Sequence, residues 1–165
     1  MGVGIFFLLY AFFSTQLLRL SYQSSKSMPQ GWYGIHPLTF PISRGEVVVF
    51  SPPPPVLAIL YTRHWIQKKA WLMKKVLGLP GDLVCLQHQN VWINQEWIAS
   101  IASEDSQHRA LPQLSFCRKL SEDEYFLMST YIPESFDSRY FGPISRAFLR
   151  GEARPIWLKN GRIFT

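Results

Sequence analysis

The distribution of apolar residues divides the chain into two parts. Residues 2–18 carry no charge, and about 17 residues at the helical rise reach about 26 Å, close to the thickness of a membrane core. Leu20 can extend the span, because Arg19 can place its charge at the lipid surface. We therefore predict a membrane anchor over residues 1–20. A cleaved signal peptide and a buried core helix remain alternatives, although no small-x-small cleavage site follows the run.

Beyond the anchor, residues 21–27 form a polar linker, and from Met28 the apolar residues lie in short stretches separated by glycine and proline. Such stretches are typical of β-strands joined by turns. Only Val56–Gln67 has helical spacing, and we expect the four prolines before it to form an extended loop. The other predicted elements are strands at Glu46–Phe50, Trp71–Leu77, Leu83–Leu86, Val91–Ile93 and Glu124–Met128, a turn at Asn94-Gln95 toward Trp97-Ile98, and a loop over Ala99–Gln113. This pattern predicts one mainly β domain over residues 21–165, a twisted barrel or sandwich with one short helix.

Composition narrows the class of partner. The chain is too apolar to be disordered, since 47% of its residues are hydrophobic and only 17% are charged. Its net charge of +6 suggests an anionic partner, either nucleic acid or a membrane surface. The basic residues are dispersed, and no recognition helix or arginine-aromatic strip collects them. We therefore expect a membrane and no nucleic acid.

Most catalytic motifs are missing from the sequence. It has no glycine-rich phosphate loop, no C-x-x-C and no H-E-x-x-H, and its 4 histidines are scattered, so we expect no metal and no cofactor. Three segments combine residues that could carry chemistry. They are S-K-S-M-P-Q-G from Ser25 to Gly31, K-K-V-L-G-L-P-G-D from Lys74 to Asp82, and S-F-D-S-R-Y-F-G-P from Ser135 to Pro143.

Together these segments resemble the type I signal peptidase family, peptidase S26, whose members are Ser-Lys proteases. The resemblance runs from Ser25 to Trp157 and is closest to the conjugative-transfer, TraF-type branch. K-S-M-P-x-G, S-F-D-S-R-Y-F-G-P-I-S-R and the final G-x-x-x-P-I-W favour that branch. The resemblance implies a signal-peptidase-like twisted β-barrel or coiled sheet behind an N-terminal transmembrane helix.

The proposed chemistry requires a serine and a neutral lysine. A serine hydroxyl becomes a good nucleophile when a base removes its proton, and burial can lower a lysine pKa enough for lysine to be that base. Lys74 and Lys75 point to opposite faces of a strand, so only one of them can face the serine. By the family's spacing to Gly78, the resemblance implies Ser27 as nucleophile and Lys74 as general base, with Lys75 solvated.

The resemblance also implies four supporting residues. Ser135 stands where the family has a hydroxyl that orients the lysine amine. Asp137 and Arg139 resemble a supporting ion pair whose bidentate geometry holds this loop against the site. Ser25 is expected to add a hydroxyl to an oxyanion hole formed mainly by the Ser27 backbone N–H. Taken alone, Asp137 and Arg139 would more often form a surface ion pair in a turn.

Cys85 and Cys117 are the chain's only cysteines. An oxidising compartment and similar cysteines in TraF-type relatives favour a disulfide between them. It would close a loop of about 32 residues, worth roughly 3–4 kcal/mol in the chain-entropy model. Two buried free thiols are the alternative.

The resemblance implies a membrane-anchored serine endopeptidase of the bacterial inner membrane, single-pass, with its catalytic domain in the periplasm. Its substrate would be an exported precursor, above all a conjugative pilin precursor, cleaved through an acyl-enzyme. One alternative is a general signal peptidase that removes signal peptides. Another is a non-catalytic assembly component of the secretion apparatus. A DNA-linked Ser-Lys autoprotease fits poorly with the apolar N-terminus and the lack of a helix-turn-helix motif.

Overall fold

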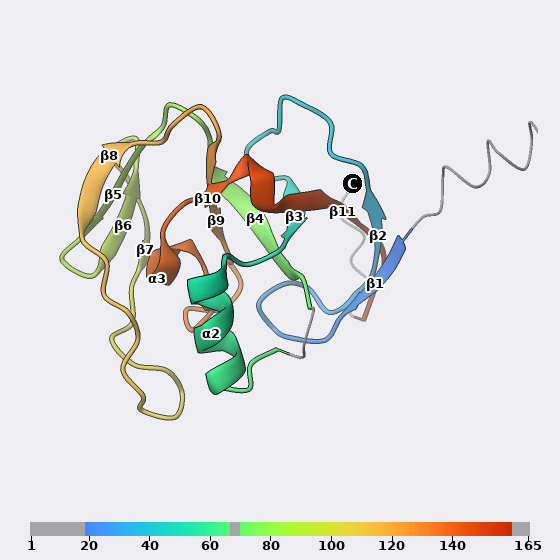
Figure 1. The fold of residues 1–165 in the computed structure, drawn as a ribbon, viewed down its shortest axis with the longest axis horizontal. Helices are drawn as coiled ribbons and strands as arrows, with labels where there is room; N and C mark the ends of the chain where they lie inside the picture. The colour runs from blue at the N-terminus through green and yellow to red at the C-terminus, as the bar shows by residue number, and fades with distance from the viewer. Residues whose placement is uncertain (1–18, 67–69, 160–165) are drawn as a thin grey trace, which may run out of the picture.

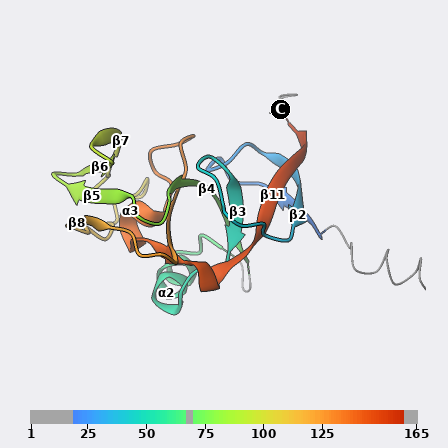
Figure 2. The ribbon, with the colours of Figure 1, turned by 90° about the horizontal axis from the view of Figure 1, so that it is seen from above.

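The computed structural model describes residues 19–66 and 70–159, which form two antiparallel sheets with short helices beside them (Figures 1 and 2). The larger, seven-stranded sheet has the order β1-β2-β11-β3-β4-β9-β10, and the smaller, four-stranded sheet has the order β7-β6-β5-β8. The bounds are β1 Arg19–Gln23, β2 Gly31–His36, β3 Val47–Phe50, β4 Leu72–Gly78, β5 Leu83–Gln87, β6 Asn90–Ile93, β7 Glu96–Ser100, β8 Phe116–Lys119, β9 Glu124–Met128, β10 Ile144–Ser145, β11 Leu149–Leu158, α2 Pro54–Thr62, α3 Ser138–Phe141 and the 3₁₀ turn η1 Arg146–Phe148. The predicted mainly β fold is confirmed.

The predicted strands and hairpins are also confirmed. Strands β3, β4, β5, β6 and β9 lie at the predicted positions to within one or two residues. His88 and Gln89 have φ values of 50° and 57°, and Asn94 and Gln95 have 51° and 71°. Two successive residues with positive φ form the turn that suits the twist of a two-residue hairpin. The small sheet is therefore a meander of β5, β6 and β7, to which β8 adds as the fourth strand.

The helix differs from its prediction at both ends. It begins at Pro54, so the expectation of an extended loop was wrong for Pro54 and Pro55. Proline is tolerated there because the first N–H groups of a helix have no intrahelical partner. The helix ends at Thr62 rather than at Gln67, and His64 has a positive φ of 56°.

The domain begins earlier than expected. Arg19 and Leu20, which we assigned to the anchor, pair with Ile35 and Gly34 of β2, and Ser21–Gln23 continue this strand. The expectation of a linker was therefore wrong for Ser21–Gln23. The remainder of the predicted anchor, residues 1–18, lies outside the described residues. Within residues 19–66 and 70–159, no helix is long and apolar enough to cross a membrane.

Strand β9 contributes to two of the three clusters of the hydrophobic core. Phe126 and Met128 pack with α2 and the small sheet, whereas Tyr125 and Leu127 pack with residues of β3 and β4. All four side chains are buried, as expected for a strand that is covered on both faces. This packing fixes β9 relative to β4, the strand that carries Lys74.

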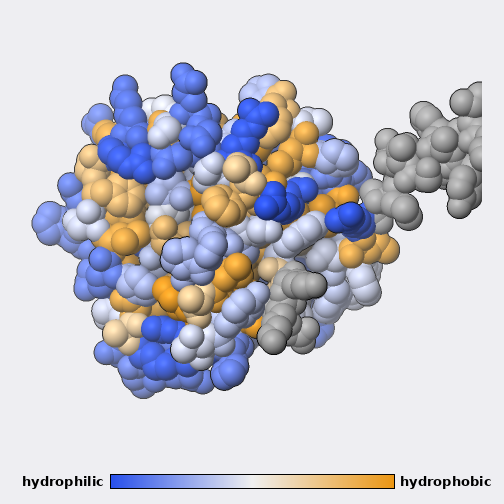
Figure 3. Space-filling view, in the orientation of Figure 1, coloured by the Kyte–Doolittle hydropathy of each residue, from blue (hydrophilic) through white to orange (hydrophobic). Residues whose placement is uncertain are grey.

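Many surface arginines are neutralised locally. Arg44 pairs with Asp82, Arg118 with Glu124 and Arg154 with Glu152, each at a distance of 2.6–2.8 Å. Figure 3 shows strongly hydrophilic residues spread over several parts of one face instead of gathered in a single patch. These three pairs each place a carboxylate beside an arginine, so part of the positive charge is compensated locally.

Candidate active site

Lys74 lies in the middle of the large sheet, where β4 runs between β3 and β9. Its side chain is 4% exposed, and its Nζ atom lies 2.8 Å from Ser135 Oγ. Burial lowers the pKa of Lys74 from 10.5 to about 8, because desolvation penalises the charged amine. Asp137 opposes this shift and Arg139 adds to it. An amine with this pKa is partly neutral near pH 8 and can accept a proton.

Lys75 differs in its surroundings from Lys74. Its side chain is half-buried rather than fully solvated, and its Nζ atom lies 5.3 Å from the centre of the Tyr131 ring. Adjacent strand residues face opposite sides, so the burial of Lys74 places Lys75 away from Ser135. Of the two lysines, Lys74 is the one with a neighbouring serine hydroxyl.

Ser27 and Ser25 lie in the segment of residues 24–30, which joins β1 to β2. Their Oγ atoms are 2.9 Å apart, and Gln23 Nε2 donates a hydrogen bond of 2.7 Å to Ser25 Oγ. Ser25, Ser27, Lys74 and Ser135 all line one cavity of about 1190 Å³. Among the described residues, no hydrogen bond joins Ser27 Oγ to Lys74 Nζ.

The cavity continues from these polar groups onto an apolar wall. That wall includes Leu60 of α2, Trp65, Leu72 and Phe136. No motif in the sequence indicated that these side chains would meet. The Trp65 ring packs on Phe136 with 5.1 Å between ring centres. The cavity thus combines an apolar wall with the serine and lysine side chains, a combination common in sites that bind an extended ligand.

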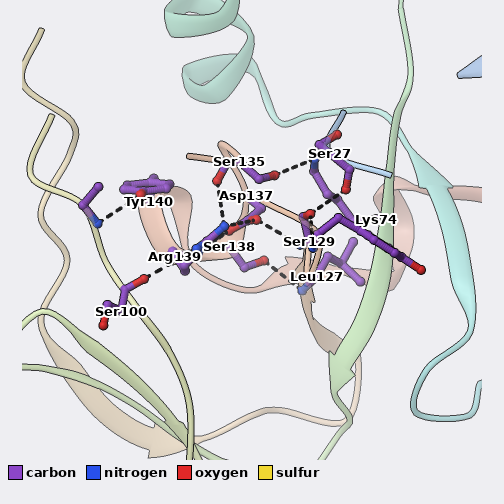
Figure 4. A network of polar contacts seen from close by, with 12 residues as sticks. Ser27, Lys74, Ser100, Leu127, Ser129, Ser135, Asp137, Ser138, Arg139 and Tyr140 are labelled. Atoms are coloured by element: carbon purple, nitrogen blue, oxygen red, sulfur yellow. Dashed lines mark hydrogen bonds and ion pairs between the residues drawn. The ribbon is translucent and has the colours of Figure 1, made fainter. Parts of the chain in front are cut away.

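Asp137 and Arg139 form a bidentate ion pair after β9 (Figure 4). Arg139 Nε donates to Asp137 Oδ1 at 2.8 Å, and Arg139 Nη2 donates to Asp137 Oδ2 at 2.9 Å. The Arg139 side chain is 1% exposed and that of Asp137 is 0% exposed. The pair is therefore buried and is not the surface pair that the local sequence alone suggested. Arg139 Nη2 also donates to the Ser135 carbonyl at 3.0 Å, which connects the pair to the residue beside Lys74.

Ser129, at the end of β9, is a residue of this site that the sequence did not indicate. Its hydroxyl donates to the carbonyl oxygen of Ser27, and its backbone N–H donates to Asp137 Oδ2 at 3.0 Å. It lies in a polar stretch, S-T-Y, that matches none of the motifs discussed above. Only the three-dimensional arrangement brings it to Ser27.

The predicted disulfide is confirmed: Cys85 and Cys117 are bonded and lie opposite each other on β5 and β8. Neither cysteine lines the cavity. The disulfide therefore joins two strands of the small sheet and takes no part in the candidate site. In the described ranges, no group of three His, Cys, Asp or Glu side chains is placed to hold a metal ion.

Known proteins are similar to this chain over most of its length. The family model for signal peptidase, peptidase S26, matches residues 1–158. The plasmid transfer protein TraF of Escherichia coli is 32% identical over 143 residues, which cover 81% of this chain and 79% of that protein. The conjugal transfer protein TraF of Agrobacterium fabrum is 29% identical over 142 residues, covering 79% and 78%.

Signal peptidases are also among the similar proteins. The probable signal peptidase I-2 of Synechocystis is 30% identical over 111 residues, covering 67% of this chain and 45% of that protein. The crystal structure of a signal peptidase I from Enterococcus faecalis aligns with a TM-score of 0.40 and 22% identity, covering 67% of this chain and 95% of that one. The family resemblance of the three motifs is confirmed by the family model and the relatives, and the chain belongs to the signal peptidase family, peptidase S26.

Proposed function

We propose that this chain is a membrane-anchored Ser-Lys endopeptidase that cleaves exported precursor proteins through an acyl-enzyme at Ser27. The observation that carries the proposal is the buried Lys74 amine, with a pKa of about 8, beside Ser135 and on the same cavity as Ser27. A buried lysine without an ionic partner is costly, and such groups concentrate at functional sites. The chain belongs to a family of serine peptidases, and this membership supports Ser27 as nucleophile and Lys74 as general base.

In the first step, neutral Lys74 Nζ accepts the proton of Ser27 Oγ as that oxygen bonds to the scissile carbonyl carbon. The carbonyl oxygen takes the negative charge, and the Ser27 backbone N–H with the Ser25 hydroxyl stabilises it. The Lys74 ammonium then gives its proton to the leaving amine as the C–N bond breaks. A water molecule, deprotonated by Lys74, attacks the resulting ester and releases Ser27.

Ser135 and Ser25 have distinct roles in this mechanism. Ser135 Oγ holds the Lys74 amine by its 2.8 Å hydrogen bond, which limits the rotation of a long, flexible side chain. Ser25 holds the Ser27 hydroxyl in the absence of substrate, since their Oγ atoms are 2.9 Å apart. When a peptide carbonyl enters the cavity, the Ser25 hydroxyl becomes free to donate to its oxygen.

The substrate we propose is a pilin precursor of a conjugation apparatus. The similarity to proteins named plasmid transfer protein TraF and conjugal transfer protein TraF supports this choice. We propose further that residues 1–18 anchor the enzyme in the bacterial inner membrane, with the domain that begins at strand β1 in the periplasm, where an exported precursor is accessible. Water or a bound amine can accept the acyl group, so the product is a free acid or an amide.

Acylation by a penem or another β-lactam-like probe, read by mass spectrometry, tests the proposal. We expect the probe mass on Ser27 in the wild type, none in Ser27→Ala, and a strongly slowed reaction in Lys74→Ala. The matched control is Lys75→Ala, which removes the neighbouring amine and should still be acylated. An unmodified wild type, together with pilin maturation by Ser27→Ala, would show a non-catalytic assembly component instead.

A general signal peptidase is the second candidate, favoured by the similarity to the probable signal peptidase I-2 of Synechocystis. The chemistry at Ser27 and Lys74 would be the same, and only the substrate would differ. Cleavage of a pilin precursor and of ordinary secretory precursors should be compared at equal enzyme concentration. A higher kcat/KM for the secretory precursors would favour the general enzyme.

A further inference from the structure

Ser129 connects two parts of the site that are far apart in sequence. Its side chain is 2% exposed, and its hydroxyl donates to the carbonyl oxygen of Ser27, 102 positions away. The same Oγ atom accepts the backbone N–H of Tyr131 at 3.1 Å. The Ser129 hydroxyl thus uses both its donor and its acceptor capacity and has a fixed direction.

This bond is important because Ser27 and Lys74 lie on different parts of the fold. Ser27 belongs to residues 24–30, between β1 and β2, whereas Lys74 belongs to β4. Among the described residues, the other hydrogen bonds of residues 24–30 remain within residues 23–33 or reach Lys159. Ser129 therefore supplies the hydrogen bond that ties the Ser27 segment to the side of the site holding Lys74 and Ser135. Met28, packed near Met73, adds apolar contact.

The Asp137–Arg139 pair extends this connection to both candidate catalytic groups. Asp137 Oδ2 accepts the Ser129 N–H at 3.0 Å and so fixes the backbone from which the Ser129 hydroxyl projects. Arg139 Nη2 donates to the Ser135 carbonyl at 3.0 Å and fixes the residue that holds Lys74. The buried ion pair thus forms hydrogen bonds to Ser129, which binds Ser27, and to Ser135. Because Ser135 binds Lys74, one network includes both candidate catalytic residues (Figure 4).

We propose that Ser129 is a positioning residue that aligns Ser27 with Lys74 through the Ser27 carbonyl. The proposal rests on the proposed Ser-Lys mechanism. Fixing the Ser27 carbonyl fixes the Ser27 Cα–Cβ direction and hence the place of Oγ relative to Lys74 Nζ. A reacting atom displaced by about 1 Å can slow a reaction by about 100-fold. The Ser129 hydroxyl does not touch the substrate, so its effect should fall on kcat.

Ser129→Ala tests this role cleanly, because it removes the hydroxyl and keeps the backbone N–H to Asp137. We expect kcat for precursor cleavage to fall by about 10- to 100-fold with KM nearly unchanged. The pH midpoint of kcat should stay in place, since Ser135, Asp137 and Arg139 still surround Lys74. Ser129→Thr returns the hydroxyl and should recover most of the lost kcat.

Ser138→Ala is the matched control. Ser138 is also a fully buried serine whose hydroxyl binds the backbone of β9, at Leu127 N, 3.0 Å away, and it has no bond to Ser27. We expect thermal stability to fall by a similar amount in Ser129→Ala and Ser138→Ala. A large fall in kcat is expected only in Ser129→Ala. Equal kcat values in the two variants would overturn the positioning role.

The wild type and Ser27→Ala, measured in the same assay, separate the two proposals. If Ser27→Ala cleaves as fast as the wild type, the Ser-Lys mechanism fails, whatever Ser129→Ala does. If Ser27→Ala is inactive and Ser129→Ala retains full kcat, the mechanism stands and the role of Ser129 fails. Should Ser129→Ala not fold, Ser129→Thr and Ser129→Cys provide the test, because both fill the site and only threonine restores a hydroxyl.

Discussion

The buried ion pair of Asp137 and Arg139 makes a quantitative prediction about stability. We consider Asp137→Asn, which keeps the shape of the side chain and removes its charge. Asp137 accepts four hydrogen bonds, from Arg139 Nε, Nη2 and N and from Ser129 N. An asparagine has one acceptor oxygen and one NH₂ group, so on one side a donor would face a donor.

The magnitude follows from the burial of the partner. Arg139 is 1% exposed, so after the substitution its charge has neither water nor a carboxylate to compensate it. Breaking a buried pair in this way costs about 3–5 kcal/mol. The free energy of unfolding of a domain is about 5–15 kcal/mol in total. If the wild type lies at the lower end of this range, the variant should be close to unfolding at 37 °C.

The assay is urea unfolding of the full chain in mild detergent, followed by tryptophan fluorescence. The control is Glu152→Gln, since Glu152 and Arg154 also form a bidentate pair two residues apart, with distances of 2.8 and 2.9 Å. Arg154 is 59% exposed, so water can replace its partner and the control should change little. Equal losses in the two variants would refute the argument from burial.

Three further predictions concern Lys74 and Ser135. The rate of cleavage should rise with pH and reach half its maximum near pH 8, because Lys74 has a pKa of about 8 and acts when neutral. The control Lys75→Ala should keep this midpoint. A midpoint near pH 10.5 would contradict the assignment of Lys74 as the base. Lys74→Met should abolish cleavage yet raise the free energy of unfolding at pH 7 by up to about 3 kcal/mol. This gain should shrink between pH 8 and 10.5, where the unfolded wild type binds more protons than the folded one, and urea titrations at several pH values measure it. Ser135→Ala should lower kcat by about 10- to 100-fold, with recovery in Ser135→Thr, and an unchanged kcat would mean that the hydroxyl does not orient the amine.

The elements that were predicted correctly are those that a pattern of neighbouring residues identifies. β-Branched residues mark β3, and turn residues mark the hairpin of β5 and β6. The longest strand, β11, escaped prediction because it contains Pro155, which removes a donor from the ladder. The structure accommodates Pro155 next to a register shift between Pro155 and Trp157. Strand β1 was hidden because it directly follows the apolar segment.

The family motifs brought Ser25, Ser27, Lys74 and Ser135 to attention, and the structure places all four around one cavity. The motif did not reveal that Asp137 and Arg139 are buried, because opposite charges two residues apart in a turn usually face solvent. Ser129 could not be predicted at all. A hydroxyl gains its role from a partner 102 positions away, and a short polar stretch carries no sign of that partner.

The buried pair also explains how Lys74 can stay reactive beside a carboxylate. Asp137 alone would stabilise the ammonium form and raise the pKa of Lys74, which would lower the neutral fraction of the amine at a given pH. Arg139 binds both oxygens of Asp137 and lowers the pKa of Lys74, so its charge opposes that of Asp137 at the amine. Desolvation then dominates and keeps the pKa near 8. The Asp137–Arg139 pair, which has no net charge, can therefore hold Ser129 and Ser135 by hydrogen bonds while Lys74 stays without an ion-pair partner. An unpaired aspartate at position 137 would instead form an ion pair with the Lys74 ammonium.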